Sequence, residues 1–377
     1  MSQAAKAPHG YLLVELDEQL MAEFETQRYF SVKGADDDDA VLCTRSTTLK
    51  LRSVESSNQL FLCTPGDGRC HAIVDHHLEV LQISPPLAPL KKLVLASGFY
   101  NGPTASQALP SSASSELWST EMLLREPSIQ MSGRELRRAL SKKLRAFEID
   151  GHWRILGDEY LWDILQDIFL TAEEQGWSLQ SLPTVDLLSA LTSGSSMGPE
   201  DNAKWSVCVA QVLRMYGNKV RGPDASQPAG GPTWGLDFSA IASLLGQMLL
   251  RLKPNWKWEE FIAGVQARLP EEAKSFPLTP DLWFGHARFL RKKPPGASQA
   301  QPGAEIEALE TLNESELPQD PRLRFKALFQ KQNSWRDVEL LPFIEPLVTP
   351  TVDLNALLVK FSRSVQDPLG SRHYYPR

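Results

Sequence analysis

Between residues 11 and 83, hydrophobic and polar positions alternate in short runs that are rich in β-branched and aromatic side chains. The runs are YLLVELD, RYFSVKG, AVLCTRSTTLKLRSV, NQLFLCT and HAIVDHHLEVLQI, and turn-forming segments such as GADDDD and PGDG separate them. Such a pattern predicts β-strands, and we expect an all-β, barrel-like unit over residues 1–96. About 75 residues of short strands build only a small core, so strands from another chain are expected to stabilise this unit.

A different pattern begins after Pro85. The Ser/Ala/Pro-rich stretch TASQALPSSASS predicts a linker over 97–116. From residue 117 onward, hydrophobic residues recur at intervals of three and four, with hairpin-like segments between the helices that this spacing predicts. The predicted helices include residues of about 158–174, 184–191, 200–215, 238–252 and 256–268.

The segment RELRRALSKKLRAFEIDGHWRIL, residues 134–156, combines a basic helix pattern with a hairpin pattern. Ser132 and Glu135, at its start, have the spacing of a capping box. Helices with a hairpin folded back on them form a winged-helix unit, a module that binds nucleic acid or protein.

The hairpin in this segment has two possible registers. A two-residue loop would pair Phe147 with Arg154, whereas a three-residue loop would pair Phe147 with Trp153. The second register separates apolar from polar side chains more cleanly, so the sequence favours it and predicts that Arg154 lies outside the core.

The helix and hairpin pattern recurs to the end of the chain, and four units can be drawn. The predicted fold is α+β and multidomain, an N-terminal all-β barrel-like unit followed by tandem winged-helix domains. The predicted parts after the linker are a winged-helix region over 117–236, a winged-helix domain over 237–315 and a C-terminal winged-helix domain over 316–377.

The last predicted helix has one hydrophobic face. Its side chains at i, i+3, i+4 and i+7 are Leu354, Leu357, Leu358 and Phe361, and this spacing leaves Lys360 and Arg363 pointing away from the core. The tail SRHYYPR is expected to form the last wing.

Composition is that of a soluble globular protein, with 42% hydrophobic and 23% charged residues. The most apolar helix pattern, FSAIASLLGQMLLRL, is interrupted by polar residues and too short for a membrane span, and the N-terminus lacks the order of a secretory signal. We therefore expect an intracellular protein without a membrane partner. The four cysteines show no CxxC spacing, which predicts reduced, mostly buried thiols: Cys43, Cys63, Cys70 and Cys208.

Charge is distributed unevenly along the chain. The net charge of −7 argues against a protein coated in basic surface. Nine acids lie in residues 1–40, whereas residues 134–154 and the C-terminal residues are rich in Lys and Arg. This distribution indicates a protein partner at one end and a polyanion at the other. The alternative is that the basic residues are ordinary solvated helix surface.

Three strings imitate active or metal sites. GSSMG at 194–198 matches G-x-S-x-G but lacks the strand before it that a nucleophile elbow needs. DHH at 75–77 lies in a strand pattern, where His76 and His77 face opposite ways, so a zinc site with Cys70 and His71 is disfavoured. The acids at 36–39 lack the spacing of a calcium loop. With no P-loop and no G-x-G-x-x-G either, the sequence predicts no enzyme, metal or cofactor.

Several segments, in order, resemble one known family. GHWRIL after a helix pair, and the C-terminal RFKALFQKQNSW, LPFIEPL and LNALLVKFSRS, resemble the "defective in sister chromatid cohesion" proteins, accessory subunits of the alternative replication factor C clamp loader. The resemblance is strongest over 145–156 and 322–365. AVLCTRSTTLKLRSVESSNQLFL and LKKLVLASGFYNGP fit the same family more loosely. Pro/Gly/Ser insertions at 222–232 and 294–303 depart from it.

The resemblance implies a non-catalytic nuclear subunit that acts in DNA replication and sister chromatid cohesion. Its N-terminal β region would bind a small accessory subunit and the tail of the loader's large subunit, and would dock on the leading-strand DNA polymerase, with the sliding clamp reached indirectly. Its winged helices, three by this resemblance, would contact single- and double-stranded DNA. The candidate DNA-binding residues are Lys360, Arg363, Arg372 and Arg377. A winged-helix protein scaffold that binds no DNA is the alternative.

Overall fold

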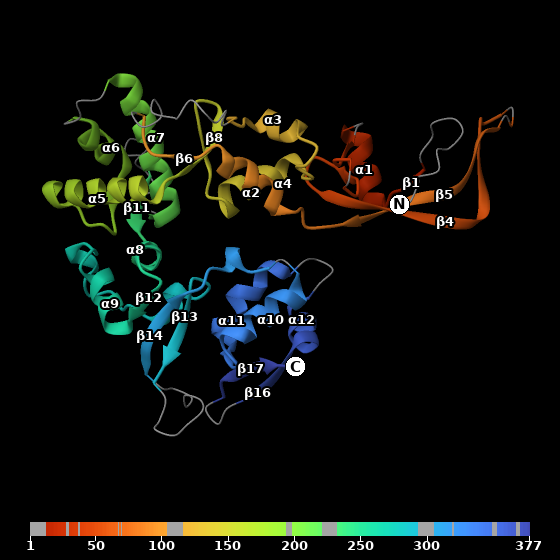
Figure 1. Ribbon diagram of the computed structural model, residues 1–377. Coiled ribbons are helices and arrows are strands. Elements are labelled where there is room, and N and C mark those ends of the chain that lie inside the picture. Colours follow the sequence, from red (N-terminus) through yellow and green to blue (C-terminus); the bar gives the residue numbers. More distant parts are fainter. Residues whose placement is uncertain are drawn as a thin grey trace. The chain divides into compact units, whose positions relative to one another are not determined.

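The chain is a mixed α+β protein with two compact units (Figure 1). The first unit joins Met1–Tyr100 with Pro110–Ile155, and the second joins Asn101–Leu109 with Leu156–Arg377. The computed structural model describes residues 13–27, 30–36, 38–66, 68, 70–103, 116–193, 198–220, 232–292, 305–318, 320–348, 353–366 and 370–377. Among these residues, no helix combines the length and the apolar character that crossing a membrane requires.

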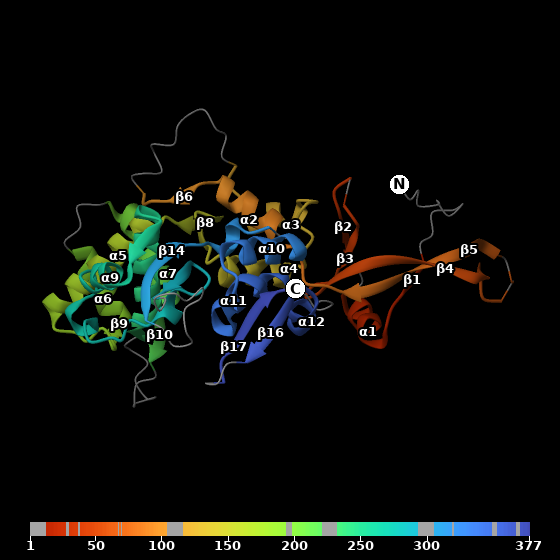
Figure 2. The same ribbon diagram turned by 60° about the horizontal axis from the view of Figure 1, so that its bottom comes forward.

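The first unit begins with an open five-stranded sheet in the order β1-β5-β4-β3-β2. Strands β4 and β5 pair antiparallel and form a long ribbon (Figure 1, Figure 2). The bounds in this part are β1 (Val14–Glu15), α1 (Glu18–Gln27), β2 (Ser31–Lys33), β3 (Val41–Cys43), β4 (Thr48–Cys63) and β5 (Cys70–Gln82).

The prediction of an all-β, barrel-like unit is wrong in two respects. Within the described residues β1 and β2 are free edges, so the sheet does not close, and the part also contains helix α1. Within the described residues its hydrophobic cluster is small: Leu20, Leu42 and Leu49 are buried, and Leu16, Phe30, Leu51 and Val80 pack partly buried against them.

A second core in the first unit lies across the predicted linker. Helix α2 (Leu87–Ala96) buries Leu90 and Val94 in one cluster with residues of α3 (Thr120–Arg125) and α4 (Gly133–Arg138). Residues 104–115 of the linker lie outside the described residues. The remaining elements here are β6 (Phe99–Tyr100), the π-helix η2 (Ala139–Lys143), β7 (Phe147–Ile149) and β8 (His152–Leu156).

This part of the first unit follows a chain order that occurs four times within the described residues. The order is helix, strand, two or three helices or helical turns, then two strands, and the last strand always lies in the middle of a three-stranded sheet. The four sheets have the orders β6-β8-β7, β10-β11-β9, β12-β14-β13 and β15-β17-β16.

The second unit contains the other three repeats. The first of them comprises α5 (Asp158–Gln175), β9 (Leu182–Pro183), α6 (Thr184–Ser193), α7 (Pro199–Tyr216), β10 (Gly217–Val220) and β11 (Thr233–Leu236). The next comprises α8 (Phe238–Leu252), β12 (Asn255–Lys257), α9 (Trp258–Gln266), η3 (Glu271–Ala273), η4 (Pro280–Trp283), β13 (Ala287–Arg291) and β14 (Ile306–Thr311). The last comprises α10 (Pro321–Lys331), β15 (Trp335–Arg336), α11 (Asp337–Ile344), η6 (Glu345–Leu347), α12 (Leu354–Phe361), β16 (Ser362–Gln366) and β17 (Arg372–Pro376), after the short η5 (Glu314–Glu316).

Local sequence explains where several helices begin. The predicted capping box is confirmed: the Ser132 hydroxyl accepts from the backbone N–H of Glu135, and the Glu135 carboxylate accepts from the backbone N–H of Ser132. Asp237 and Asp353 cap α8 and α12 in the same way with their carboxylates. These caps satisfy backbone donors that have no partner inside the helix.

The register predicted for the β7–β8 hairpin is wrong. The strands pair Phe147 with Arg154 and Ile149 with His152, around a two-residue Asp150–Gly151 loop. Both loop residues have positive φ, 51° and 76°, as this tight turn requires. Because Arg154 shares a face with Phe147, the arginine is buried, only 7% exposed. Its side chain was predicted to lie outside.

Candidate functional site

The last repeat, which carries the four candidate DNA-binding residues, is built around an aromatic core. Phe325 on α10 lies against Phe361 on α12, with ring centroids 5.3 Å apart, and Trp335 lies edge-on to Phe343. Arg324 is fully buried beneath this core, where its guanidinium donates to Glu314 and to three backbone carbonyls: Pro318, Leu317 and Phe343. One basic residue of α10 is therefore structural.

Helix α12 presents the face that its sequence predicts. Leu357 and Leu358 are buried in the core, and Leu354 and Phe361 pack partly buried against it. Lys360 is exposed, and its ammonium lies 5.3 Å from the centre of the Phe361 ring. The predicted apolar face of this helix and the exposure of Lys360 are confirmed, but the helix ends at Phe361, so Arg363 lies in strand β16 and not on the helix.

The hairpin β16–β17 has two distinct faces. Tyr374 pairs with Trp335 and with Ser364, and it is buried, so this face lies against the core. Arg363 pairs with Tyr375 on the opposite face, with its guanidinium 5.8 Å from the centre of the tyrosine ring. The described residues of the two strands, SRSVQ and RHYYP, include no acid. A cation next to an aromatic ring is a combination that suits contact with phosphate and base.

Three of the four candidate residues lie near one another, at the junction of α12 and the hairpin. Lys360 and Arg363 are three residues apart, and the Arg377 guanidinium donates to the backbone carbonyl of Val359, 2.5 Å away. Arg372 pairs with Gln366 at the other end of the hairpin and shares the face of Tyr374. A side-chain hydrogen bond to Tyr374 raises the pKa of Arg372, so this arginine stays charged.

Two further residues lie on the same face of the hairpin as Arg363, and the sequence did not predict them as site residues. Arg336 pairs with His373 on this face, and Tyr375 lies beside Arg363. Arg336 also contacts Glu339, at 3.8 Å. Its position directly after the buried Trp335 in a two-residue strand is the signal that could have identified it.

The first repeat carries another group of cations. On α4, η2 and the residue that follows them, six basic side chains are exposed: Arg134, Arg137, Arg138, Lys142, Lys143 and Arg145. Arg154 does not join them, since its guanidinium lies 5.5 Å from the centre of the Tyr100 ring and donates to the carbonyl of Phe99. Burial lowers the pKa of Arg154.

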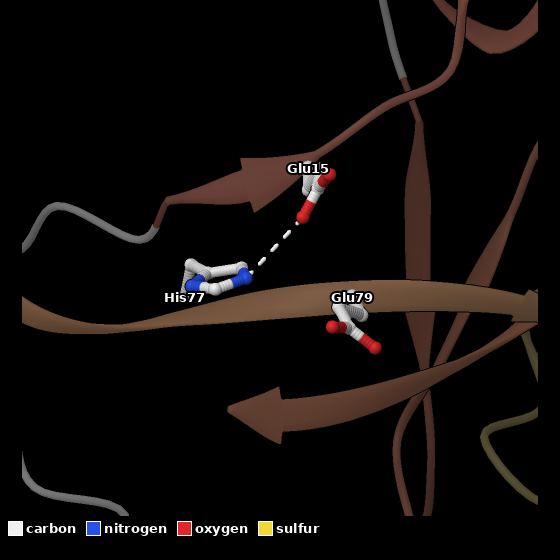
Figure 3. Close-up of side chains that lie close together, drawn as sticks. All are labelled: Glu15, His77 and Glu79. Carbon is white, nitrogen blue, oxygen red and sulfur yellow. Dashed lines mark ion pairs between the residues drawn. The ribbon is translucent and has the colours of Figure 1, made fainter. Parts of the chain in front are cut away.

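The histidines of the DHH string have different partners. His76 contacts Asp75, whereas Nε2 of His77 lies 3.2 Å from the Glu15 carboxylate (Figure 3). The alternation predicted for these two residues is confirmed. Glu79 lies within 4.8 Å of His77 and Glu15, a grouping of metal-ligand types, but the Glu79 carboxylate is already paired with Arg52. A cation at this place would face the Arg52 guanidinium, which opposes metal binding.

The remaining candidate segments and the four cysteines lie apart from these sites. Residues 194–197 of GSSMG and both Pro/Gly/Ser insertions, apart from Pro232, lie outside the described residues. Asp39 forms an ion pair with Lys50, and this contact lowers the pKa of Asp39. Cys43 and Cys208 are buried but Cys63 and Cys70 are exposed, so the prediction of mostly buried thiols is wrong for the cysteine pair at the end of the ribbon.

Comparison with known proteins identifies the family of this chain. The family model described as "Sister chromatid cohesion protein Dcc1" matches residues 11–344. "Sister chromatid cohesion protein DCC1" of Xenopus tropicalis is 28% identical over 94% of this chain and 86% of its own length, and that of Homo sapiens is 27% identical over 95% and 86%. The "Probable sister chromatid cohesion protein DCC1" of Dictyostelium discoideum is 24% identical over 96% and 93%. The resemblance predicted from the sequence is thereby confirmed, and the chain belongs to the Dcc1 family of sister chromatid cohesion proteins.

Proposed function

We propose that this chain is a non-catalytic accessory subunit of an alternative, replication factor C-like clamp loader, acting in DNA replication and sister chromatid cohesion in the nucleus. Its family and the names of its relatives support the role in cohesion. The observation that carries the proposal of a complex subunit is the apolar ribbon β4–β5.

This ribbon exposes hydrophobic side chains on both faces. Leu60, Phe61 and Leu62 are consecutive, so they alternate between the faces, and they are 42%, 59% and 44% exposed. Ile73, which pairs with Phe61, is 48% exposed. Contiguous apolar surface of this kind marks a protein interaction site, and open sheet edges accept added strands.

The proposed partners of this sheet are the small accessory subunit and the tail of the loader's large subunit. In the same proposal the assembled module docks on the leading-strand DNA polymerase, and the sliding clamp is reached indirectly through the loader. A sheet whose buried cluster, among the described residues, consists of Leu20, Leu42 and Leu49 gains stability from such strands, because they cover apolar surface that is otherwise exposed to water.

Co-purification tests this part of the proposal. Phe61→Ser combined with Ile73→Ser removes the exposed pair without touching the buried cluster, and we expect the variant to lose the two partner subunits. Leu252→Ser is the control, since Leu252 is 75% exposed in the other unit. Undiminished recovery of both partners with the ribbon variant would exclude the ribbon as their binding site.

We further propose that the four repeats are winged-helix units. The strand order with the last strand in the middle, and a hairpin after the third helix or its helical turns, support this proposal. The division into 1–96, a linker over 97–116, and winged-helix parts over 117–236, 237–315 and 316–377 remains our proposal for the domains, except that α2 and β6, which fall in 1–96 and in the linker, belong to the first repeat. In the last unit, α12 is the recognition helix and β16–β17 is the wing.

DNA is the proposed ligand of this last unit, through Lys360, Arg363, Arg377 and, at the far end of the hairpin, Arg372. Phosphate contact by lysine and arginine is independent of sequence and weakens as salt rises. The absence of acids from strands β16 and β17, within the residues that the structure describes, and the tyrosine beside Arg363 support binding of both single- and double-stranded DNA.

Fluorescence anisotropy with labelled single- and double-stranded oligonucleotides tests this ligand. Changing Lys360, Arg363 and Arg377 to Ala is expected to weaken binding and to reduce the slope of log K against log salt by about 3, one for each phosphate that the variant no longer neutralises. The matched control changes three exposed basic residues of α10, and thus the same net charge: Arg322, Lys326 and Lys331. Equal weakening by both triple variants, or no DNA binding by the native chain, would favour the protein scaffold.

A further inference from the structure

A pocket of about 650 Å³ lies in the first unit, between the sheet and the start of α4. The sheet contributes Lys33 of β2 and Arg45 of the β3–β4 turn, and the helix contributes Arg134 and Arg137. These four residues come from segments almost 100 positions apart. The side chains of Leu124 and Met131 add an apolar wall.

Several hydrogen bonds hold the two sides of this pocket together. The Lys33 ammonium donates to the carbonyls of Met131 and Ile129, at 3.1 and 3.4 Å. The backbone N–H of Arg134 donates to the carbonyl of Arg45, at 3.2 Å. These bonds hold the backbone at the start of α4 against the sheet, so Lys33 and the backbones of Arg45 and Arg134 are placed side by side before any ligand arrives.

None of the residues that line the pocket is acidic. Two carboxylates accept hydrogen bonds from hydroxyls of lining or neighbouring residues: Glu135 accepts from Thr48 and Ser132, and Glu23 accepts from Ser46. Within the described part of the chain, no ion pair involves Arg45, Arg134 or Arg137.

We propose that this pocket binds a phosphorylated side chain of a protein partner. A phosphate carries a charge of about −1.5 to −2 at neutral pH and three acceptor oxygens, and arginine forks bind it with two parallel hydrogen bonds. A carboxylate, with one charge, compensates fewer of the four cations. Clusters of arginine are a recurrent means of recognising phosphorylated peptides.

The shape of the pocket favours a peptide over nucleic acid. A duplex presents its phosphates along a line, which a row of cations on a convex helix would follow, whereas these four cations converge on one concavity. The apolar wall of Leu124 and Met131 suits the aliphatic part of a neighbouring peptide residue. Strand β2, which contributes Ser31 and Lys33 to the lining, pairs on one side only among the residues that the structure describes, and its other side can pair with an extended peptide.

Anisotropy with three fluorescein-labelled peptide pools tests the proposal on the full chain. The pools have degenerate flanking positions and carry phosphoserine, serine or glutamate at the centre. We expect the phosphoserine pool to bind at least about tenfold more tightly than the serine pool, with the glutamate pool between them. Inorganic phosphate should displace the phosphoserine pool better than chloride at equal ionic strength.

Two double variants distinguish the pocket from general electrostatics. Arg134→Ala with Arg137→Ala should abolish the preference for phosphoserine, whereas Arg138→Ala with Lys142→Ala, on the same helix and with the same loss of charge, should retain it. Arg134→Lys with Arg137→Lys keeps the charge without the forked donors and should lose part of the preference. All are exposed positions, and equal thermal unfolding midpoints establish that the variants fold.

Two results would overturn the proposal. Equal binding of the phosphoserine and serine pools, or a phosphoserine preference that survives removal of Arg134 and Arg137, would exclude a phosphate site in this pocket. If instead the pocket variant weakened binding of a labelled DNA duplex about tenfold while the phosphoserine pool bound no better than serine, the ligand would be nucleic acid and the assignment of its class wrong. Neither result depends on the C-terminal hairpin or the apolar ribbon.

Discussion

Gly246, in the middle of α8, is in contact with a fully buried tryptophan, so its replacement by alanine is a sharp test of the packing. A Cβ at this position would lie 2.5 Å from Cε2 of Trp283 and closer still to Nε1. The same Nε1 donates a hydrogen bond to the carbonyl of Ala242, at 3.2 Å. The indole therefore cannot shift away from the new methyl group without breaking this hydrogen bond.

The expected cost follows from three contributions. Overpacking a closed core costs about 1–3 kcal/mol. A buried indole N–H that loses its acceptor adds about 1–3 kcal/mol. The higher helix propensity of alanine relative to glycine offsets about 1 kcal/mol of this destabilisation. Gly246→Ala should therefore lower the local free energy of unfolding by about 3 kcal/mol, which corresponds to roughly a hundredfold change in the opening equilibrium.

Native-state hydrogen exchange measures the local free energy of opening, and it applies even to a chain whose global unfolding is not two-state. Amides of α8 should exchange about a hundredfold faster in the variant. Gly264→Ala on α9 is the matched control, since its Cβ would meet the ends of two flexible side chains, Leu249 at 3.1 Å and Arg268 at 3.9 Å. Unchanged exchange in α8, or equal acceleration by the control, would refute the packing of Trp283 on Gly246.

Two further predictions concern buried polar groups and thiols. Arg324→Met should lower the free energy of unfolding of the last repeat by about 3–5 kcal/mol, because Glu314 and three backbone carbonyls lose their donor. Urea denaturation measures this loss, and an unchanged unfolding midpoint would contradict the prediction. A thiol reagent should modify the exposed Cys63 and Cys70 rapidly, and the buried Cys43 and Cys208 only after denaturation. Burial also raises the pKa of Cys208 to about 12, which slows its reaction further. Four rapid reactions would contradict the burial of Cys43 and Cys208.

Much of the helical architecture was determined by the sequence alone. The predicted helices near 158–174 and 200–215 correspond to Asp158–Gln175 and Pro199–Tyr216. The capping box at Ser132 and the apolar face of α12 were also predicted. These features depend on residues within one or two helical turns, so periodicity and caps are sufficient to identify them. Family membership likewise rests on the order of segments along the chain.

Contacts between distant residues were decided only by the tertiary structure. Arg154 is buried because the Tyr100 ring and the Phe99 carbonyl receive its guanidinium, and β8 lies between β6 and β7; a short hairpin pattern contains neither fact. Within the described residues the sheet is open, with β1 and β2 at its edges, and strand patterns along the chain do not state whether the edge strands meet. The pocket joins Lys33 to Arg134 through contacts that no local pattern encodes. Burial and charge convergence are properties of neighbours in space, and those neighbours lie up to about 100 residues away along this chain.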